Sequence, residues 1–317
     1  MAAVFVSVIG PNLLMHERVS LNDGYRALRW IANLPADRPL VVLVGSSHTQ
    51  HGIDHELLEA ELARRGVNVH VGILAFGGMA PIEQHFYLRS YRALGLKVPD
   101  AVLFEVAPTW AFNPVWPIWQ NRHSPRMVEM MDWRSTAEAL RWTFSIGRAD
   151  WALDILGLAA RDYLGFSVLS ARVPFAQVPP QDPTYPLAGQ RPSFTQEAYE
   201  SAKAGPAGPQ GAWNELQLSR QQSERMARTA EETGSRLVGF YVVPFVGVRD
   251  ADQARLCPEH RFCLVPDDAL MEELDRYELW YDASHVQAEG RRRFTIWFAG
   301  RIADQLRRAL PSVPGGR

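Results

Sequence analysis

Short apolar runs and segments with apolar residues at helical spacing alternate along the chain. Five runs rich in branched or aromatic residues are typical of buried strands, at 41–44, 67–75, 98–106, 236–243 and 277–281. Helical patterns lie between and after them, at 54–65, 81–95, 213–233, 267–274 and 289–310. A strand followed by a helix, repeated about five times, favours a parallel sheet with helices on both faces.

The helix over 54–65 has the clearest boundaries, because Asp54 is a good N-cap and Gly66 is a C-cap signal. A further amphipathic helix is expected within 16–38. Residues 174–211 are rich in Pro, Gly, Gln and Ala, and we expect them to form extended or mobile loops.

Two serines stand where the first predicted strand ends. The apolar residues 41–44 run directly into Gly45, Ser46 and Ser47. Open α/β sheets bind ligands at the carboxyl ends of their strands. A serine on that turn has its hydroxyl at a cleft and backbone N–H groups beside it, as a nucleophile with an oxyanion hole requires.

The other end of the chain contains a base for this nucleophile. Asp282 and His285 follow an apolar stretch and precede a helical C-terminus. On a loop, residues at this spacing can place a carboxylate against one imidazole nitrogen while the other nitrogen faces Ser47. We therefore expect a catalytic triad of Ser47, Asp282 and His285.

These residues resemble the SGNH (GDSL-type) hydrolase superfamily. Gly-Ser-Ser at 45–47 and Asp-x-x-His at 282–285 carry the resemblance, which spans about residues 40–305 with a long unmatched middle. The family usually has Asp at the position of Ser46, and this departure resembles the branch of membrane-associated and periplasmic polysaccharide O-acyltransferases. The resemblance implies a serine-dependent acyl-ester hydrolase or O-acyltransferase that works through an acyl-enzyme intermediate without a cofactor. Its substrate would carry an acetyl or similar acyl group on a carbohydrate or another small ester.

The resemblance also implies a fold. It indicates an α/β protein, a three-layer α/β/α sandwich with a five-stranded parallel sheet in flavodoxin-like order. We expect residues 39–310 to form this domain, with a helical and loop insertion at about 114–212. Residues 1–38 would form an N-terminal segment.

In the resembling family, the amide of the nucleophile and a glycine amide after the second strand hold the oxyanion. Gly78 is our choice for that glycine, with Gly77 or Ala80 as alternatives. The family's Gly-x-Asn-Asp element, whose Asn also donates, is absent here, and we assign its role to Thr109 or, more remotely, Asn113. Its absence leaves open a non-catalytic binding or assembly protein on the same scaffold.

Candidate substrate-binding residues are His48, Trp110 and Asn113. Trp110 opens a section with six tryptophans between residues 110 and 151. Such an aromatic wall stacks on sugar rings or holds an acyl chain; the alternative is a satellite hydrophobic cluster under the loops. Glu105, at a strand end, is either a cleft carboxylate or a buried structural residue.

The two cysteines, Cys257 and Cys263, have five residues between them. They form either a small disulfide loop, which indicates an oxidising compartment, or two free thiols. A zinc site with His260 lacks a fourth ligand. His51 and His55 have the spacing of a metal pair on a helix, but exposed or capping histidines are more usual, so we expect no metal.

Composition limits the classes of partner and the cellular locations that the sequence favours. The 317 residues have a net charge of −2 and no long basic run, which does not favour nucleic acid. Residues 2–15 are apolar but shorter than the ~20 that span a bilayer. They form either the first core element or the trailing half of a membrane anchor. We expect a periplasmic or extracytoplasmic protein, with membrane association through the N-terminus as an open alternative and a cytoplasmic location as another.

Overall fold

The structure is a computed structural model that describes residues 18–19, 21–106, 136–137, 139–141, 144, 149–163, 173–184, 192–203, 220–247, 257 and 261–310. Two compact units divide the chain. The expected domain over 39–310 and its insertion at about 114–212 stay predictions. Much of that insertion, and residues 1–17 and 20 of the N-terminal segment, lie outside the described residues.

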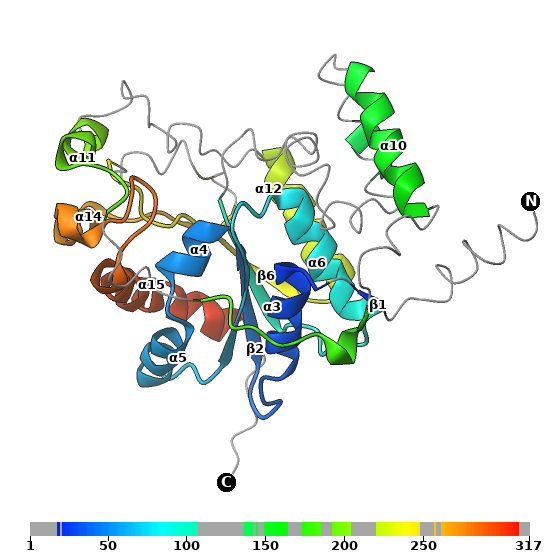
Figure 1. Cartoon of the computed structure of the whole chain (residues 1–317). Helices are drawn as coiled ribbons and strands as arrows, with labels where there is room; N and C mark the ends of the chain where they lie inside the picture. The colour runs from blue at the N-terminus through cyan, green and yellow to red at the C-terminus, as the bar shows by residue number, and fades with distance from the viewer. Residues whose placement is uncertain are drawn as a thin grey trace, which may run out of the picture. The chain divides into compact units, whose positions relative to one another are not determined.

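The larger unit is built around a five-stranded parallel sheet (Figure 1). In spatial order its strands are β3 (His70–Ala75), β2 (Leu40–Gly45), β4 (Ala101–Glu105), β6 (Arg236–Tyr241) and β7 (Cys263–Leu264). In chain order this is 2-1-3-4-5, the order of flavodoxin-like sheets. Every residue of β2, β3 and β4 is buried, as expected of strands covered on both faces.

Helices of this unit cover both faces of the sheet. α5 (His55–Arg64) connects β2 to β3 and packs against α15 (Ala288–Ala309). α12 (Arg220–Thr233) packs on β6 and lies on the opposite face (Figure 1). The β2-to-β3 and β4-to-β6 connections run in opposite directions across the sheet, so right-handed crossovers place their helices on opposite faces. The predicted α/β/α sandwich with a five-stranded parallel sheet is confirmed.

Capping residues fix the helix ends near the sheet. Asp54 caps α5 and accepts a hydrogen bond from Leu57 N at 3.1 Å, and Gly66 follows the helix with φ of +77°. Asp267 caps α14 (Asp268–Glu273) in the same way. These boundaries agree with the predicted ones.

The smaller unit contains the N-terminal helix that we expected. α3 (Asp23–Ala32) packs against α6 (Pro81–Ala93), where the rings of Tyr25 and Tyr87 meet edge to face with centroids 5.3 Å apart. β1 (Arg18–Val19) pairs antiparallel with β5 (Val173–Pro174). Other elements that the structure describes in this unit are η3 (Ala149–Trp151), α10 (Ala152–Tyr163) and η5 (Phe175–Gln177).

Two predicted elements are wrong. Residues 277–281 do not form the fifth strand, which is β7; Tyr277–Leu279 is a 3₁₀ turn, η8, and Trp280 bridges Val286 in an antiparallel sense. The apolar side chains of this run are buried by loop packing, and Trp280 Nε1 donates to the Leu274 carbonyl at 2.8 Å.

The expected loop over 174–211 also contains regular structure. It includes η5 and the helix α11 (Gln196–Lys203), whose apolar side is anchored by the buried ring of Tyr199. None of the described helices is both long enough and apolar enough to cross a membrane.

Candidate active site

Ser47 begins a short helix at the carboxyl edge of the sheet. β2 ends at Gly45, and Ser46 caps α4 (Ser47–Gly52), with its Oγ accepting from His48 N at 3.3 Å. The sequence predicted a turn that continues to Asp54, but the helix begins at Ser47 itself. Ser47 is therefore the first residue of a helix.

The strand ends place this serine at the point where the order of the sheet reverses. β2 pairs with β3 on one side and with β4 on the other, with Gly45 opposite Ala75 and Val44 opposite Phe104. The carboxyl ends of these three strands therefore lie at one edge of the sheet. Open α/β sheets bind their ligands at this switch point.

Ser47, His285 and Asp282 form one hydrogen-bonded chain. His285 Nε2 lies 2.9 Å from Ser47 Oγ, and His285 Nδ1 lies 2.9 and 2.8 Å from the two carboxylate oxygens of Asp282. An ionised carboxylate only accepts, so Nδ1 carries the proton and Nε2 is left to accept the serine hydroxyl. This is the geometry of an activated nucleophile.

The loop before α15 holds the acid and base in place. Asp282 Oδ1 accepts from Ser284 N at 2.8 Å and from His285 N at 2.9 Å. Val246 N donates to the Ala283 carbonyl at 2.9 Å, which ties the loop to the segment after β6. Asp282 and His285 are three positions apart, and at this spacing the Asp282 carboxylate accepts from the backbone of its own turn and also reaches the imidazole.

Asp282 is ionised in this site. Burial alone would raise its pKa, but the hydrogen bond and charge of His285, together with the bonds from Ser284, lower the pKa to about 2. The side chain is half-buried. An acid held in this state fixes the tautomer of His285 across the neutral range.

A second, fully buried carboxylate lies beneath the serine turn. The Glu105 side chain, at the end of β4, is 2% exposed. It accepts from Ser46 N and from Ser46 Oγ, both at 2.7 Å, and from Thr49 Oγ1 at 2.5 Å. His48 Nδ1 lies 3.1 Å from its Oε1. Of the two alternatives for Glu105, the structure therefore favours the buried, hydrogen-bonded role.

These donors explain why a carboxylate is stable there. Burial alone would raise the pKa of Glu105, but the hydrogen bond and charge of His48, with the bonds from Ser46 and Thr49, hold that pKa below its ordinary value. The Glu105 anion in turn raises the pKa of Tyr241, after the larger effect of burial. Since Thr49 donates its hydroxyl hydrogen to Glu105, Tyr241 is the donor in its 2.7 Å bond to Thr49.

Gly45 is required by this cluster. A Cβ at this position would overlap Thr49 Oγ1 and Glu105 Oε2. The glycine of the Gly-Ser-Ser element is thus explained by side-chain packing over β2 rather than by an unusual backbone angle.

The three histidines after the nucleophile lie in different surroundings. The His48 ring lies 4.8 Å from the His285 ring and 4.7 Å from the Phe245 ring, and the His51 ring lies 5.5 Å from His285. His55 Nδ1 pairs instead with Thr184 Oγ1 at 2.9 Å. Within the described part of the chain, no cluster of three or more histidine, cysteine or acidic residues is arranged to hold a metal ion.

The predicted oxyanion donors are described in part. Gly78 lies in the turn after β3 with φ of +64°, a conformation that favours glycine. The Ala80 amide donates to Glu83 Oε2 at 2.7 Å, so it is not available as an oxyanion donor. The Ser47 amide, as the first of a helix, has no intrahelical acceptor. Thr109, Trp110 and Asn113 lie outside the described residues.

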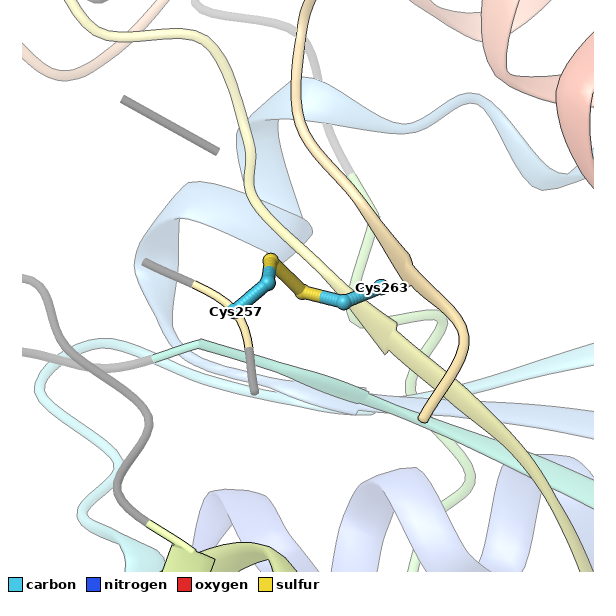
Figure 2. Close-up of a disulfide and its surroundings, with 2 residues drawn as sticks. All are labelled: Cys257 and Cys263. Atoms are coloured by element: carbon cyan, nitrogen blue, oxygen red, sulfur yellow. A yellow bond between two sulfur atoms is a disulfide. The ribbon is translucent and has the colours of Figure 1, made fainter. Parts of the chain in front are cut away.

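Cys257 and Cys263 are joined by a disulfide (Figure 2). Their Cα atoms are 5.7 Å apart, and Cys263 is the first residue of β7. Their sulfur atoms are therefore neither free thiols nor zinc ligands in this structure.

Comparison with models of known protein families finds no match to this chain, and comparison with curated protein sequences finds none either. The chemistry assigned to the site therefore depends on the geometry of its own residues.

Proposed function

We propose that this protein is a serine-dependent acyl-ester hydrolase or O-acyltransferase, similar to SGNH-type esterases. The hydrogen-bonded chain from Ser47 Oγ through His285 to Asp282 carries the proposal. Its position at the switch point of the sheet supports it further, because a substrate reaches that edge.

In the first half of the reaction, Ser47 Oγ attacks the ester carbonyl and His285 Nε2 takes the hydroxyl proton. Asp282 keeps Nδ1 protonated and stabilises the imidazolium that forms. The amides of Ser47 and Gly78, with the hydroxyl of Thr109, stabilise the oxyanion. The alcohol leaves, and an acyl-Ser47 ester remains.

In the second half, water or a sugar hydroxyl attacks the acyl-enzyme. Water gives ester hydrolysis, and a sugar hydroxyl gives acyl transfer. We propose a small-molecule or carbohydrate ester of an acetyl or similar acyl group as substrate, bound by His48, Trp110 and Asn113 and handled without a cofactor.

The disulfide supports an extracytoplasmic location. Such bonds form and persist in oxidising compartments and are rare in the cytosol. We therefore propose a periplasmic or other extracytoplasmic protein, and keep membrane association through the N-terminus as part of this proposal.

A screen of acyl esters, with and without oligosaccharide acceptors, tests this function. Mass spectrometry would follow both free acid and acylated acceptor, with Ser47→Ala as the matched control. Products that need Ser47 support the proposal, and their distribution separates hydrolysis from transfer. A folded wild-type protein that turns over no ester would favour the non-catalytic scaffold.

A further inference from the structure

A second imidazole lies beside the nucleophile and takes no part in the triad. The His48 ring lies 4.8 Å from the His285 ring, and its side chain is 16% exposed. Its Nδ1 lies 3.1 Å from Glu105 Oε1 and 3.1 Å from Ser46 Oγ.

The hydrogen bonds of this cluster fix the tautomer of His48. Ser46 Oγ donates its single hydrogen to Glu105 Oε1, so it can only accept from His48. The ionised Glu105 also only accepts. The hydrogen in both contacts must therefore reside on His48 Nδ1.

This tautomer leaves Nε2 of a neutral His48 with its lone pair. Nε2 has no hydrogen-bond partner among the residues that the structure describes. The arrangement repeats that of His285, whose Nδ1 is held by Asp282 and whose Nε2 faces Ser47. Two carboxylate–imidazole pairs thus lie beside one serine, although the attack of Ser47 uses only one.

We propose that His48 is a second acid–base residue of this site, which transfers the proton of the leaving group and of the acyl acceptor. His285 then transfers only the proton of Ser47. The inference rests on the proposed function and deepens it by assigning the two proton transfers to two histidines.

The proton transfers balance over one cycle. In acylation, the bond from Ser47 Oγ to the carbonyl carbon forms and the bond from that carbon to the leaving oxygen breaks. His285 Nε2 takes the Ser47 proton. His48 enters this step protonated at both ring nitrogens, as the preceding deacylation leaves it, and gives its Nε2 proton to the leaving oxygen. In deacylation, the acceptor oxygen bonds to the carbonyl carbon and its proton goes to His48 Nε2. The bond to Ser47 breaks, and His285 returns the proton to Ser47 Oγ.

The charged and titratable neighbours of His48 suit this exchange. The Glu105 carboxylate, 3.1 Å from Nδ1, accepts a hydrogen bond from the ring whether or not Nε2 is protonated. When His285 becomes an imidazolium 4.8 Å away, repulsion between like charges favours loss of the His48 proton at that step.

The variant His48→Asn separates a chemical role from a structural one. An asparagine Nδ2 takes the place of Nδ1 and keeps a donor to Glu105, while Nε2 is lost. We would follow p-nitrophenyl acetate hydrolysis, because nitrophenolate leaves without a proton. With this substrate, His48 releases its Nε2 proton to solvent before it accepts the proton of water. We expect the acylation burst to persist and the steady-state rate, set by deacylation, to fall about 10²-fold or more.

His51→Asn is the matched control, because the His51 ring also lies near His285, at 5.5 Å. We expect it to keep the wild-type steady-state rate. A wild-type steady-state rate in His48→Asn would overturn the inference and leave His48 a structural residue. Loss of the burst and of turnover together, in a folded variant, would also overturn it, because His48 would then act through the nucleophile.

A wild-type protein without a burst would contradict the proposed function itself, which is a different result. If His48→Asn does not fold, ¹⁵N NMR of the wild-type ring gives the answer. A neutral ring with its hydrogen on Nδ1 and with Nε2 bare supports the inference. A neutral ring protonated on Nε2, with Nδ1 bare, overturns it.

Discussion

At the scale of single residues, the adjacent serines have different partners. Ser47 Oγ bonds His285, whereas Ser46 Oγ bonds the buried Glu105. We expect Ser47→Ala to lower kcat on the order of 10³-fold or more, because it removes the nucleophile. Its melting temperature should stay near that of the wild type. Full ester turnover in Ser47→Ala would contradict the assignment.

Ser46→Ala should instead affect stability. It removes a hydrogen bond to a charged group, which typically contributes about 1.5–3 kcal/mol, and it removes the cap of α4. Urea unfolding would measure the decrease in the free energy of unfolding. We expect Ser47 to remain reactive in this variant. If the Ser46→Ala protein is stable but its Ser47 no longer reacts, the assigned roles of the two serines are contradicted.

The lowered pKa of Asp282 has two consequences for the pH dependence. Because this pKa is about 2, Asp282 is ionised above about pH 4, and its own protonation should not limit kcat/KM above that pH. The folded-state pKa lies below the unfolded value of about 3.9, so its contribution to stability is present above about pH 4 and is lost as the pH falls towards 2. A pH–rate profile and acid unfolding would measure both effects.

Asp282→Asn should lower kcat on the order of 10³-fold or more, because an amide supports the wrong imidazole tautomer. Its folded state should persist, since Asn retains an oxygen that accepts from Ser284 N. A variant with the wild-type rate would remove Asp282 from the triad.

The triad could be predicted from the sequence because each member belongs to a local pattern: a strand end for Ser47 and an Asp-x-x-His loop for Asp282 and His285. The role of Glu105 could not. It depends on the register of β4 against β2, with Val44 opposite Phe104, which no local pattern reveals. The only signal was a charged residue at the end of an apolar run.

At the scale of elements, packing at the end of β2 controls the serine turn. Gly45→Ala would force a methyl group into Thr49 Oγ1 and Glu105 Oε2. We expect a loss of about 1–3 kcal/mol in the free energy of unfolding, as for other overpacked sites, and a displaced Ser47. Gly77→Ala is the control, because a Cβ there meets nothing within 4 Å. Equal stability of the two variants would refute this explanation of Gly45.

Strong periodicity and caps made β2, α5 and α15 predictable, whereas the pattern over 277–281 and the short strand β7 were not sufficient to predict the edge of the sheet. The run over 277–281 has the composition of a strand, but tertiary packing buries Trp280 in a loop. The true edge strand, β7, has only two residues, and the first of them is the disulfide-bonded Cys263. Such a short strand has no periodicity of its own and is defined by its pairing with β6.

At the scale of the whole molecule, the disulfide joins the edge of the sheet to the preceding loop. Cys257 and Cys263 are six positions apart, so the bond closes a small loop whose contribution to stability is about 2 kcal/mol in the chain-entropy description. We expect reductant to lower the urea midpoint by a corresponding amount. Cys257→Ser/Cys263→Ser, the control, should not respond to reductant. An unchanged midpoint in the reduced wild type would show that the bond does not stabilise the sheet.

The central claim is that Ser47 is a nucleophile activated by His285 and Asp282. The most direct measurement is reaction of the folded protein with a fluorophosphonate, followed by peptide mapping of the adduct. We expect one adduct on Ser47, none in Ser47→Ala, and greatly slowed labelling in His285→Ala and Asp282→Asn. An adduct on Ser46, or a folded wild-type protein that does not react, would contradict the claim.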